Sequence, residues 1–273
     1  MRSPVCSVLK GLERGAHVTT ATEMKDLREF YTEVKEIKEV VAALTAIRDA
    51  AAADIVRPDV DGISAFSRLY TVITENVLET VEGRKPREFR DPKFLTRLDL
   101  EFAQRYLDAI KLYSDKSADT PKSWDVLFSQ RRAKEIRHVN FAAAGVNAHV
   151  NFDLTFALLE TWGDFPPNRR RHKDYNEVNR IFAEEMNKLR DSFEAFLSGV
   201  DDDGSPADKL GILMSNLLVR WTRAVAWWAA RWVWMFRRFG DTRYQRAYAR
   251  MLRRQDRAAA AIGRAVLKAP RIP

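Results

Sequence analysis

Apolar residues recur at helical spacing along most of the chain, and this periodicity constrains the fold more than any other sequence feature. Residues 23–52 place Leu27, Phe30, Val34 and Ile37 three or four positions apart, with charged residues between them. Such a stripe is typical of an amphipathic α-helix. No segment of any length alternates polar and apolar residues with period two, and no repeat period is apparent. The pattern predicts an all-α protein.

Glycine and proline are scarce, at 11 and 10 residues in 273, and they fall between the periodic segments. Such scarcity favours helices over a turn-rich β fold. Asp91 and Pro92 have the character of a helix start, with Asp91 as the N-cap and Pro92 at the first helical position. The predicted helices cover 23–52, 63–81, 92–113, a short run around Trp124, a segment from 141 to Trp162, 175–197, 210–236 and 241–268.

Positive charge is concentrated at the C-terminal end. The whole chain carries a net charge of +8, and the residues from Arg237 to Pro273 include eleven Lys and Arg against two Asp. The remainder of the chain is therefore close to neutral. We expect a flexible N-terminal segment (1–22), one multi-helix, bundle-like domain (23–236) and a long basic C-terminal helix (241–268).

Cysteine usage and the N-terminal residues bear on the compartment. Cys6 is the only cysteine, which excludes an internal disulfide framework and a zinc site built from several thiolates. Lys10 interrupts the first apolar run, so no signal-peptide core is present and a cytoplasmic location is expected. The apolar segment 217–236 is long, but Arg223 and Arg231 lie within it and are costly in a bilayer, so it is not expected to be transmembrane.

The segment 141–154, FAAAGVNAHVNFDL, is apolar almost all round and carries a polar pair. His149 and Asp153 are four residues apart and therefore share one helix face. Ala142 and Gly145 lie on the same face and project very little, which predicts a hollow beside His149. A helix that is apolar on nearly every side is central and buried, so its polar groups need partners.

Three interpretations of this pair stay open. His149 and Asp153 can simply hydrogen-bond each other and tie neighbouring helices together. Alternatively, Asp153 orients His149 as a general acid or base that faces a small-molecule cavity. In the third interpretation both side chains bind a divalent metal, and His138 or an acid from another helix completes the ligand shell. Asp99, which lies beside a core face, is one such acid.

Four further residues are candidates for substrate binding. Asn147 and Asn151 form a second polar pair, on roughly the opposite side of the same helix. Arg223 and Trp227 come from the tryptophan-rich segment, where cations and rings alternate at a spacing that suits cation–π contacts. In the pocket wall they would hold an anionic or unsaturated ligand, although a buried aromatic helix whose arginines pair with acids of the bundle is the simpler explanation.

The C-terminal helix 241–268 supports a different class of function. Its arginines follow one side of the helix, as in Arg243, Arg246, Arg250 and Arg253. A solvated face is the simplest explanation, but nucleic acid or an anionic membrane could bind such a stripe electrostatically. No nucleic-acid-binding motif accompanies it, and nucleotide-binding and hydrolase signatures are absent from the sequence.

Several spaced motifs together resemble an uncharacterised bacterial and fungal domain family of unknown function. The similarity covers about residues 60–230, and its most specific part is the N-A-H-x-N-x-D-L core from Asn147 to Leu154. The motifs are 61-DGISAFSRLYTVIT-74, 94-FLTRLDLEFAQRYLDAI-110, 124-WDVLF-128, 143-AAGVNAHVNFDL-154, 174-DYNEVN-179 and 223-RAVAW-227. The resemblance implies one helical domain centred on the core motif, and it implies no reaction.

Two hypotheses follow from the sequence. The first is an enzyme with a cavity beside His149 and Asp153, acting on a small, largely apolar molecule through metal or acid–base chemistry. The second is a non-catalytic helical protein that binds nucleic acid or an anionic membrane through residues 241–268.

Overall fold

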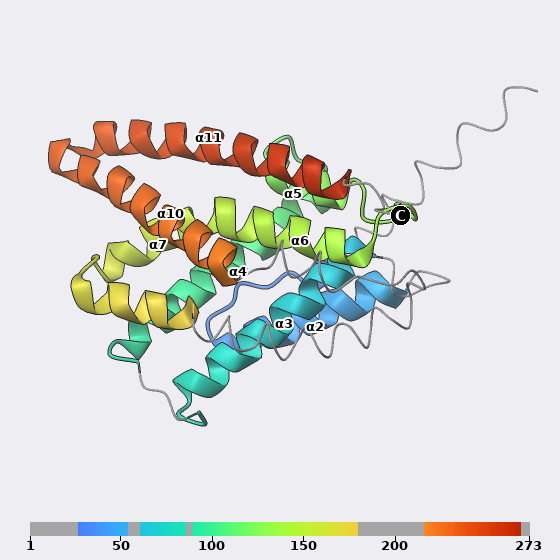
Figure 1. Cartoon of the computed structure of the whole chain (residues 1–273), viewed down its shortest axis with the longest axis horizontal. Coiled ribbons are helices and arrows are strands. Elements are labelled where there is room, and N and C mark those ends of the chain that lie inside the picture. Colours follow the sequence, from blue (N-terminus) through green and yellow to red (C-terminus); the bar gives the residue numbers. More distant parts are fainter. Residues whose placement is uncertain (1–26, 54–60, 86–88, 180–215, 269–273) are drawn as a thin grey trace, which may run out of the picture.

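The all-α prediction is confirmed by the structure, a computed structural model that describes residues 27–53, 61–85, 89–179 and 216–268. These residues form helices, turns and bends, and no β-strand occurs among them. Figure 1 shows how the helices are arranged. They are α2 (Ile37–Ala53), α3 (Gly62–Val81), α4 (Pro92–Ser114), α5 (Lys122–Phe128), α6 (His138–Ala148), α7 (Leu154–Asp164), α10 (Asn216–Met235) and α11 (Asp241–Leu267).

The first predicted helix is interrupted. A short turn of helix at 27–29 is followed by non-helical residues, and α2 begins only at Ile37. The Glu39 carboxylate accepts hydrogen bonds from the backbone N–H groups of Lys35 and Glu36, which caps α2 at this point. In addition, the Val34 N–H donates to the Gln104 side chain on α4. The chain before α2 is therefore bonded to another helix and does not form a helix continuous with α2.

Two aspartates begin the next helices. Asp61 accepts from the backbone N–H groups of Ile63 and Ser64 at the start of α3, and Arg131 donates to its other oxygen at 2.6 Å. The predicted N-cap of α4 is confirmed, because the Asp91 carboxylate accepts from the Phe94 N–H. Both caps satisfy backbone donors that a helix start leaves unpaired.

The long segment from His138 to Asp164 runs as one rod with a local change of winding. Between α6 and α7, residues His149–Asp153 form a π-helical turn, in which the Leu154 N–H bonds to the His149 carbonyl five residues earlier. Such wider turns are rare inside α-helices and often occur at functional sites. The sequence predicted a helix here, and the structure adds that its core motif occupies the π turn.

Two hydrophobic clusters form the core of the described residues, and the central rod contributes to both. The first cluster gathers α2, α3, the later turns of α4, α5, α6 and the last turns of α11, around rings such as Phe66 and Trp124. The second gathers α7, α10, the start of α4 and the first half of α11, around Trp162 and Trp227. The His149–Asp153 turn lies where one cluster gives way to the other.

Helices α10 and α11 form a hairpin along one edge of the molecule, joined through a 3-10 turn (Phe236–Phe239) and Gly240 (Figure 1). Gly240 has a φ of 93°, a conformation that suits glycine at such a reversal. α11 packs along α5 and α6, so the basic helix is part of the bundle and not a detached tail. Among the described residues no helix is both long and apolar enough to cross a bilayer.

Several predicted segments lie wholly or partly outside the described residues. They are the N-terminal segment 1–22, residues 23–26 of the predicted helix 23–52, residues 180–197 of the predicted helix 175–197, the connector 199–209 and residues 210–215. The part of helix 175–197 that can be compared, up to Asn179, is helical and begins earlier, at residue 169.

Candidate active site beside the π turn

The π turn brings His149 and Asp153 into direct contact. The His149 Nδ1 atom lies 3.1 Å from Asp153 Oδ2, and both side chains are buried. The predicted hydrogen bond between them is therefore present. The contact places one charged group and one titratable ring in the interior, where each needs specific partners.

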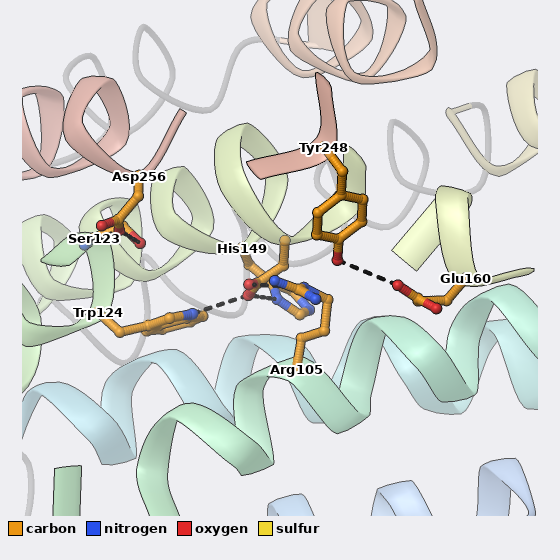
Figure 2. Close-up of polar contacts among 8 residues, drawn as sticks. Arg105, Ser123, Trp124, His149, Glu160, Tyr248 and Asp256 are labelled. Carbon is orange, nitrogen blue, oxygen red and sulfur yellow. Dashed lines mark hydrogen bonds and ion pairs between the residues drawn. The ribbon is translucent and has the colours of Figure 1, made fainter. Parts of the chain in front are cut away.

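Asp153 is held by donors from two other helices as well, and Figure 2 labels the side chains of these donors, Trp124 and Arg105. The indole N–H of Trp124 on α5 donates to Oδ2 at 2.9 Å, and Arg105 Nε on α4 donates to Oδ1 at 3.3 Å. The Arg105 guanidinium also lies over the rings of Phe152 and Phe156, at 5.5 and 5.1 Å from their centroids. An indole and a guanidinium can only donate, so Asp153 is an acceptor on both oxygens. This carboxylate joins α4, α5 and the central rod.

The tautomer of His149 follows from these contacts. Because Asp153 accepts from Trp124 and Arg105, its bond with His149 requires a proton on Nδ1. The Nε2 atom then carries the lone pair, and it has no hydrogen-bond partner within the described chain. Burial lowers the pKa of His149, and the opposing effect of Asp153 is smaller. The ring is therefore neutral near pH 7, with a free basic nitrogen.

Aromatic rings hold the imidazole in place. Phe102 stacks on it, with ring centroids 3.4 Å apart and planes at 13°, and Tyr70 meets it edge-on at 4.5 Å. Phe66 approaches from a third side, at 5.7 Å. With Nδ1 fixed by Asp153 and the ring faces packed, Nε2 has one defined direction.

A cavity of about 80 Å³ adjoins His149. A single water needs roughly 10–15 Å³ of such space, and a dry cavity of about 150 Å³ accommodates benzene. The space therefore suits a few waters or a narrow small molecule without movement of the walls. Most of its lining is apolar, and it receives residues from both hydrophobic clusters. The lining residues are Phe66, Leu69, Tyr70, Ile73, Val77, Leu95, Leu98, Asp99, Phe102, Val146, His149, Val150, Leu154, Val178 and Arg223.

Two more polar groups of the lining are without partners. Asp99 Oδ2 and the Tyr70 hydroxyl are both shielded from solvent and form no hydrogen bond with the described residues; the nearby Thr74 hydroxyl donates to the Tyr70 carbonyl instead. Burial raises the pKa of Asp99 to about 7. Burial, and then the charge of Asp99, raise the pKa of Tyr70 well above its usual value. Three unbonded polar atoms thus line one largely apolar cavity.

Arg223 lines the cavity, which is one of the two arrangements that the sequence left open for it. Its Nε donates to the Asn179 side chain at 2.5 Å and its Nη2 to the Tyr175 carbonyl at 3.2 Å, while its guanidinium lies 4.4 Å from the centre of the Tyr175 ring. Within the described residues these acceptors are neutral oxygens. Burial lowers the pKa of Arg223. A cation in an apolar wall can bind an anionic or electron-rich group of a ligand.

Other predicted site residues lie elsewhere. Trp227 is buried beside the ring of His172 at 4.4 Å and that of Trp162 at 5.0 Å, and it does not line the cavity. Asn147 and Asn151 do bond each other at 2.9 Å, but Asn147 donates to the Ala259 carbonyl of α11. Since neither asparagine lines the cavity, their geometry indicates helix packing and not contact with a substrate there.

The prediction of His138 as a third metal ligand is wrong in geometry. His138 begins α6 and His149 follows its end, so eleven residues separate them, about 16 Å along a helix axis. Both oxygens of Asp153 already accept hydrogen bonds, one of them from the cation Arg105. Among the described residues, no group of three or more His, Cys, Asp or Glu side chains could hold a metal ion.

The hollow predicted beside His149 is located differently. A side chain enters the space next to Gly145, because a Cβ added there would lie 2.3 Å from Phe66 Cδ2. The missing side chain of Gly145 therefore lets Phe66 approach the central rod. The cavity adjoins His149 between Phe66, Phe102 and other residues of α3 and α4.

Sequence reasoning did not assign site roles to Tyr70, Phe102, Arg105 or Trp124. Tyr70, Phe102 and Trp124 lie on the apolar faces of their helices, a position that indicates the core and no more. Arg105 does carry a signal, because it continues the series Leu98 and Phe102 at helical spacing and so shares their inward face. A cation on a buried face indicates a buried acceptor such as Asp153.

Comparison with known proteins places the chain in a family. A family model described as a family of unknown function, DUF5995, matches residues 37–269. The chain belongs to this family. The match extends beyond the 60–230 range of the recognised motifs and includes both α2 and α11, which agrees with the packing of α11 in the bundle. No curated protein and no solved structure matches the chain.

Proposed function

We propose that this protein acts on a small, largely apolar molecule by acid–base chemistry, with His149 Nε2 exchanging a proton with the molecule. One observation carries the proposal: a buried imidazole, oriented by a carboxylate at Nδ1, has an unbonded Nε2 beside an apolar cavity. A neutral imidazole held in this way is suited to serve as a general base.

Asp99 supports the same proposal, because it can serve as the acid of an acid–base pair. Asp99 lines the cavity, its Oδ2 atom lacks a partner among the described residues, and burial raises its pKa to about 7. A carboxyl group that is partly protonated can donate a proton to the bound molecule, and the neutral imidazole can accept one from it. Titratable groups whose pKa values are shifted by burial and that line a cavity are typical of functional sites.

Asp153 has a positioning role in this proposal. It does not line the cavity, and its oxygens are bonded to Trp124, Arg105 and His149. It fixes the tautomer of His149 and stabilises the imidazolium that forms when Nε2 takes up a proton. The simpler interpretation, a structural link between helices, explains these bonds but leaves the unbonded Nε2, Asp99 and Tyr70 atoms without a role.

The proposal is tested with small ketones and carboxylic acids that carry an exchangeable C–H bond. The purified chain is screened against such a panel by saturation-transfer NMR, and deuterium incorporation from D₂O into each bound compound is then followed. We expect one or more compounds to bind and to exchange, and His149→Asn to reduce exchange by about 10²–10⁴-fold, the usual contribution of a positioned base. Asparagine keeps a donor toward Asp153 but removes Nε2.

His172→Asn is the matched control, because His172 stacks on Trp227 outside the cavity. Exchange equal to that of the unaltered protein is expected for this control. Binding with no exchange in the unaltered protein, or exchange that survives His149→Asn, would show that the imidazole has only a structural role.

A further inference from the structure

A row of large apolar side chains is exposed on α10. Trp221, Trp228 and Phe239 are 63%, 60% and 57% exposed. The row alternates steps of four and three residues, so it follows one face of the helix and continues into the 3-10 turn. We call it the tryptophan stripe; it consists of Trp221, Val225, Trp228, Trp232, Met235 and Phe239.

The opposite face of α10 already supplies the core. Ala226, Trp227, Ala230 and Val233 are buried in the second hydrophobic cluster. The tryptophan stripe is thus an additional apolar face that the fold of the described residues does not use. A contiguous exposed patch of this kind marks an interaction site in a soluble protein.

Arginines line the neighbouring surface. On α11 they form what we call the arginine face, consisting of Arg243, Arg246, Arg250, Arg253, Arg254 and Arg257, all exposed. Residues 221–268 contain twelve Arg and Lys but only two acids, Asp241 and Asp256. Asp256 accepts hydrogen bonds from the Ser123 backbone and hydroxyl (Figure 2), so one of the two negative charges is directed to α5.

The stripe and the arginine face adjoin each other. A groove between α10 and α11 is lined by Trp221, Val225 and Trp228 from one helix and by Arg254 from the other. Toward the tip of the hairpin, a second groove combines Trp232 and Met235 of the stripe with Arg231, Arg237 and Arg238. Figure 1 shows this hairpin of α10 and α11 at the edge of the molecule, with α11 running along that edge.

We propose that the tryptophan stripe and the arginine face together form a docking surface for an anionic lipid bilayer. Tryptophan is enriched at the interface between lipid headgroups and acyl chains, and arginine binds lipid phosphates while its stem covers apolar surface. Apolar side chains beside a cationic face are typical of helices that lie in the plane of an anionic membrane. This inference does not depend on the chemistry of the cavity.

A second copy of the chain fits this surface less well. A symmetric dimer would bring the same patch of both copies together, so the arginine faces would oppose each other. Single-stranded nucleic acid is also less favoured, because bases stack on aromatic rings and the stripe includes the aliphatic side chains of Val225 and Met235. The guanidinium of Arg231 also lies over the Trp228 ring, 5.8 Å from its centre, and that of Arg243 lies over the Phe239 ring, 5.8 Å from its centre, so each occupies one face of that ring.

The test is co-sedimentation of the full chain with vesicles of phosphatidylcholine containing 30% phosphatidylglycerol, and with vesicles of phosphatidylcholine alone. We expect binding to the anionic vesicles, weakened by salt, and a blue shift of tryptophan fluorescence. Binding to the neutral vesicles should be at least tenfold weaker. The combined change Arg246→Gln, Arg250→Gln and Arg253→Gln should reduce binding on the order of 100-fold, since each basic residue contributes about 1 kcal/mol near an anionic surface.

The apolar half of the surface is tested by Trp221→Gln, Trp228→Gln and Trp232→Gln together, which should lower binding at least tenfold and remove the blue shift. Lys35→Gln, Lys38→Gln and Arg84→Gln remove the same charge from exposed positions outside α10 and α11 and should leave binding unchanged. Thermal melting confirms that each variant is folded.

Any of the following outcomes would overturn the proposal. Equal binding to neutral and anionic vesicles, or none to either, excludes an anionic bilayer as the partner. Unchanged binding by the tryptophan variant shows that vesicle binding depends on charge alone and that the stripe does not take part. Tighter binding to a single-stranded oligonucleotide than to vesicles assigns the surface to nucleic acid. Sedimentation of the free protein as a dimer that the tryptophan variant abolishes assigns the stripe to self-association.

Discussion

At the scale of single residues, the two nitrogens of His149 have different surroundings. Nδ1 faces the Asp153 carboxylate, whereas Nε2 has no partner among the described residues and adjoins an apolar cavity. This asymmetry fixes both the tautomer and the direction in which the basic lone pair is available. The imidazole is thereby prepared for proton transfer before any ligand enters.

The tautomer of His149 is directly measurable. In ¹⁵N NMR spectra we expect the Nδ1–H form near pH 7, because Asp153 accepts that proton, and a pKa below 6.5, because burial disfavours the imidazolium. Unfolding in urea should return the pKa to about 6.5. A spectrum with the proton on Nε2 would contradict the described bond with Asp153.

Asp99 predicts a pH dependence of stability. Its pKa is about 7 in the folded chain and 3.8 for an unperturbed group, so the folded state binds the proton more tightly. The resulting stabilisation is complete below about pH 4 and is lost as pH rises toward 7. Asp99→Asn should remove this pH dependence of the unfolding free energy, which amounts to up to about 1.4 kcal/mol per pH unit. At pH 8 the variant should be more stable than the unaltered chain.

Urea unfolding at several pH values measures this difference. Asp119→Asn, at an exposed position, is the control and should follow the unaltered chain at each pH. An Asp99→Asn variant with the same pH slope as the unaltered chain would show that this carboxyl is ionised in the fold without cost.

How much of the site the sequence predicts depends on where each partner lies. His149 and Asp153 are close along one helix, so their spacing alone predicts the contact that the structure contains. Arg105 and Trp124 reach Asp153 from other helices, 48 and 29 residues away, and no local spacing encodes those contacts. Asp99 was indicated by its position beside a core face, but its place in the cavity depends on the packing of α4.

At the scale of elements, the crossing of α3 and α6 depends on a missing side chain. Phe66 of α3 lies against the backbone of Gly145, and the same ring also contacts His149 and lines the cavity. The small residue was visible in the sequence, whereas the ring that fills its space was not. Helix positions were predicted well, since apolar periodicity encodes them, but the break before α2 depends on the capping by Glu39 and the tertiary bond to Gln104.

Gly145→Ala should therefore destabilise the fold. The added Cβ would lie 2.3 Å from Phe66 Cδ2, which forces the ring to move. Overpacking of this kind costs about 1–3 kcal/mol, against a gain of up to about 1 kcal/mol from the better helix propensity of alanine. Gly163→Ala in α7 is the control, because nothing lies within 4 Å of its added Cβ. Chemical denaturation should show a lower unfolding free energy for Gly145→Ala and no decrease for Gly163→Ala.

At the scale of the whole molecule, α11 is required by both halves of the core. Its first half packs in the second cluster and its last turns in the first, and the carbonyls of Ala259 and Val266 accept bonds from Asn147 and Asn140 of α6. The charge pattern of the sequence suggested a separable basic helix. Its buried alanines, which give a weak apolar signal, explain why its packing was not evident from sequence.

Deletion of residues 240–273 should consequently abolish cooperative unfolding and not merely remove a charged tail. Circular dichroism on heating should show a broad, weak transition for this truncation, because two apolar clusters lose part of their cover. Removal of 269–273 alone leaves α11 whole and should keep a sharp transition. A sharp transition in the longer truncation would show that α11 is dispensable for folding.

The π turn at His149–Asp153 also has a consequence for the assembly of the bundle. In a π turn each repeat takes up more residues than in an α-helix, so the side chains after it are rotated relative to those before it. One uninterrupted rod can then bury one side among the aromatic residues of the first cluster and a different side in the second. Loss of one residue within the turn would restore regular winding, and every side chain of α7 would then face about 100° away from its present neighbours.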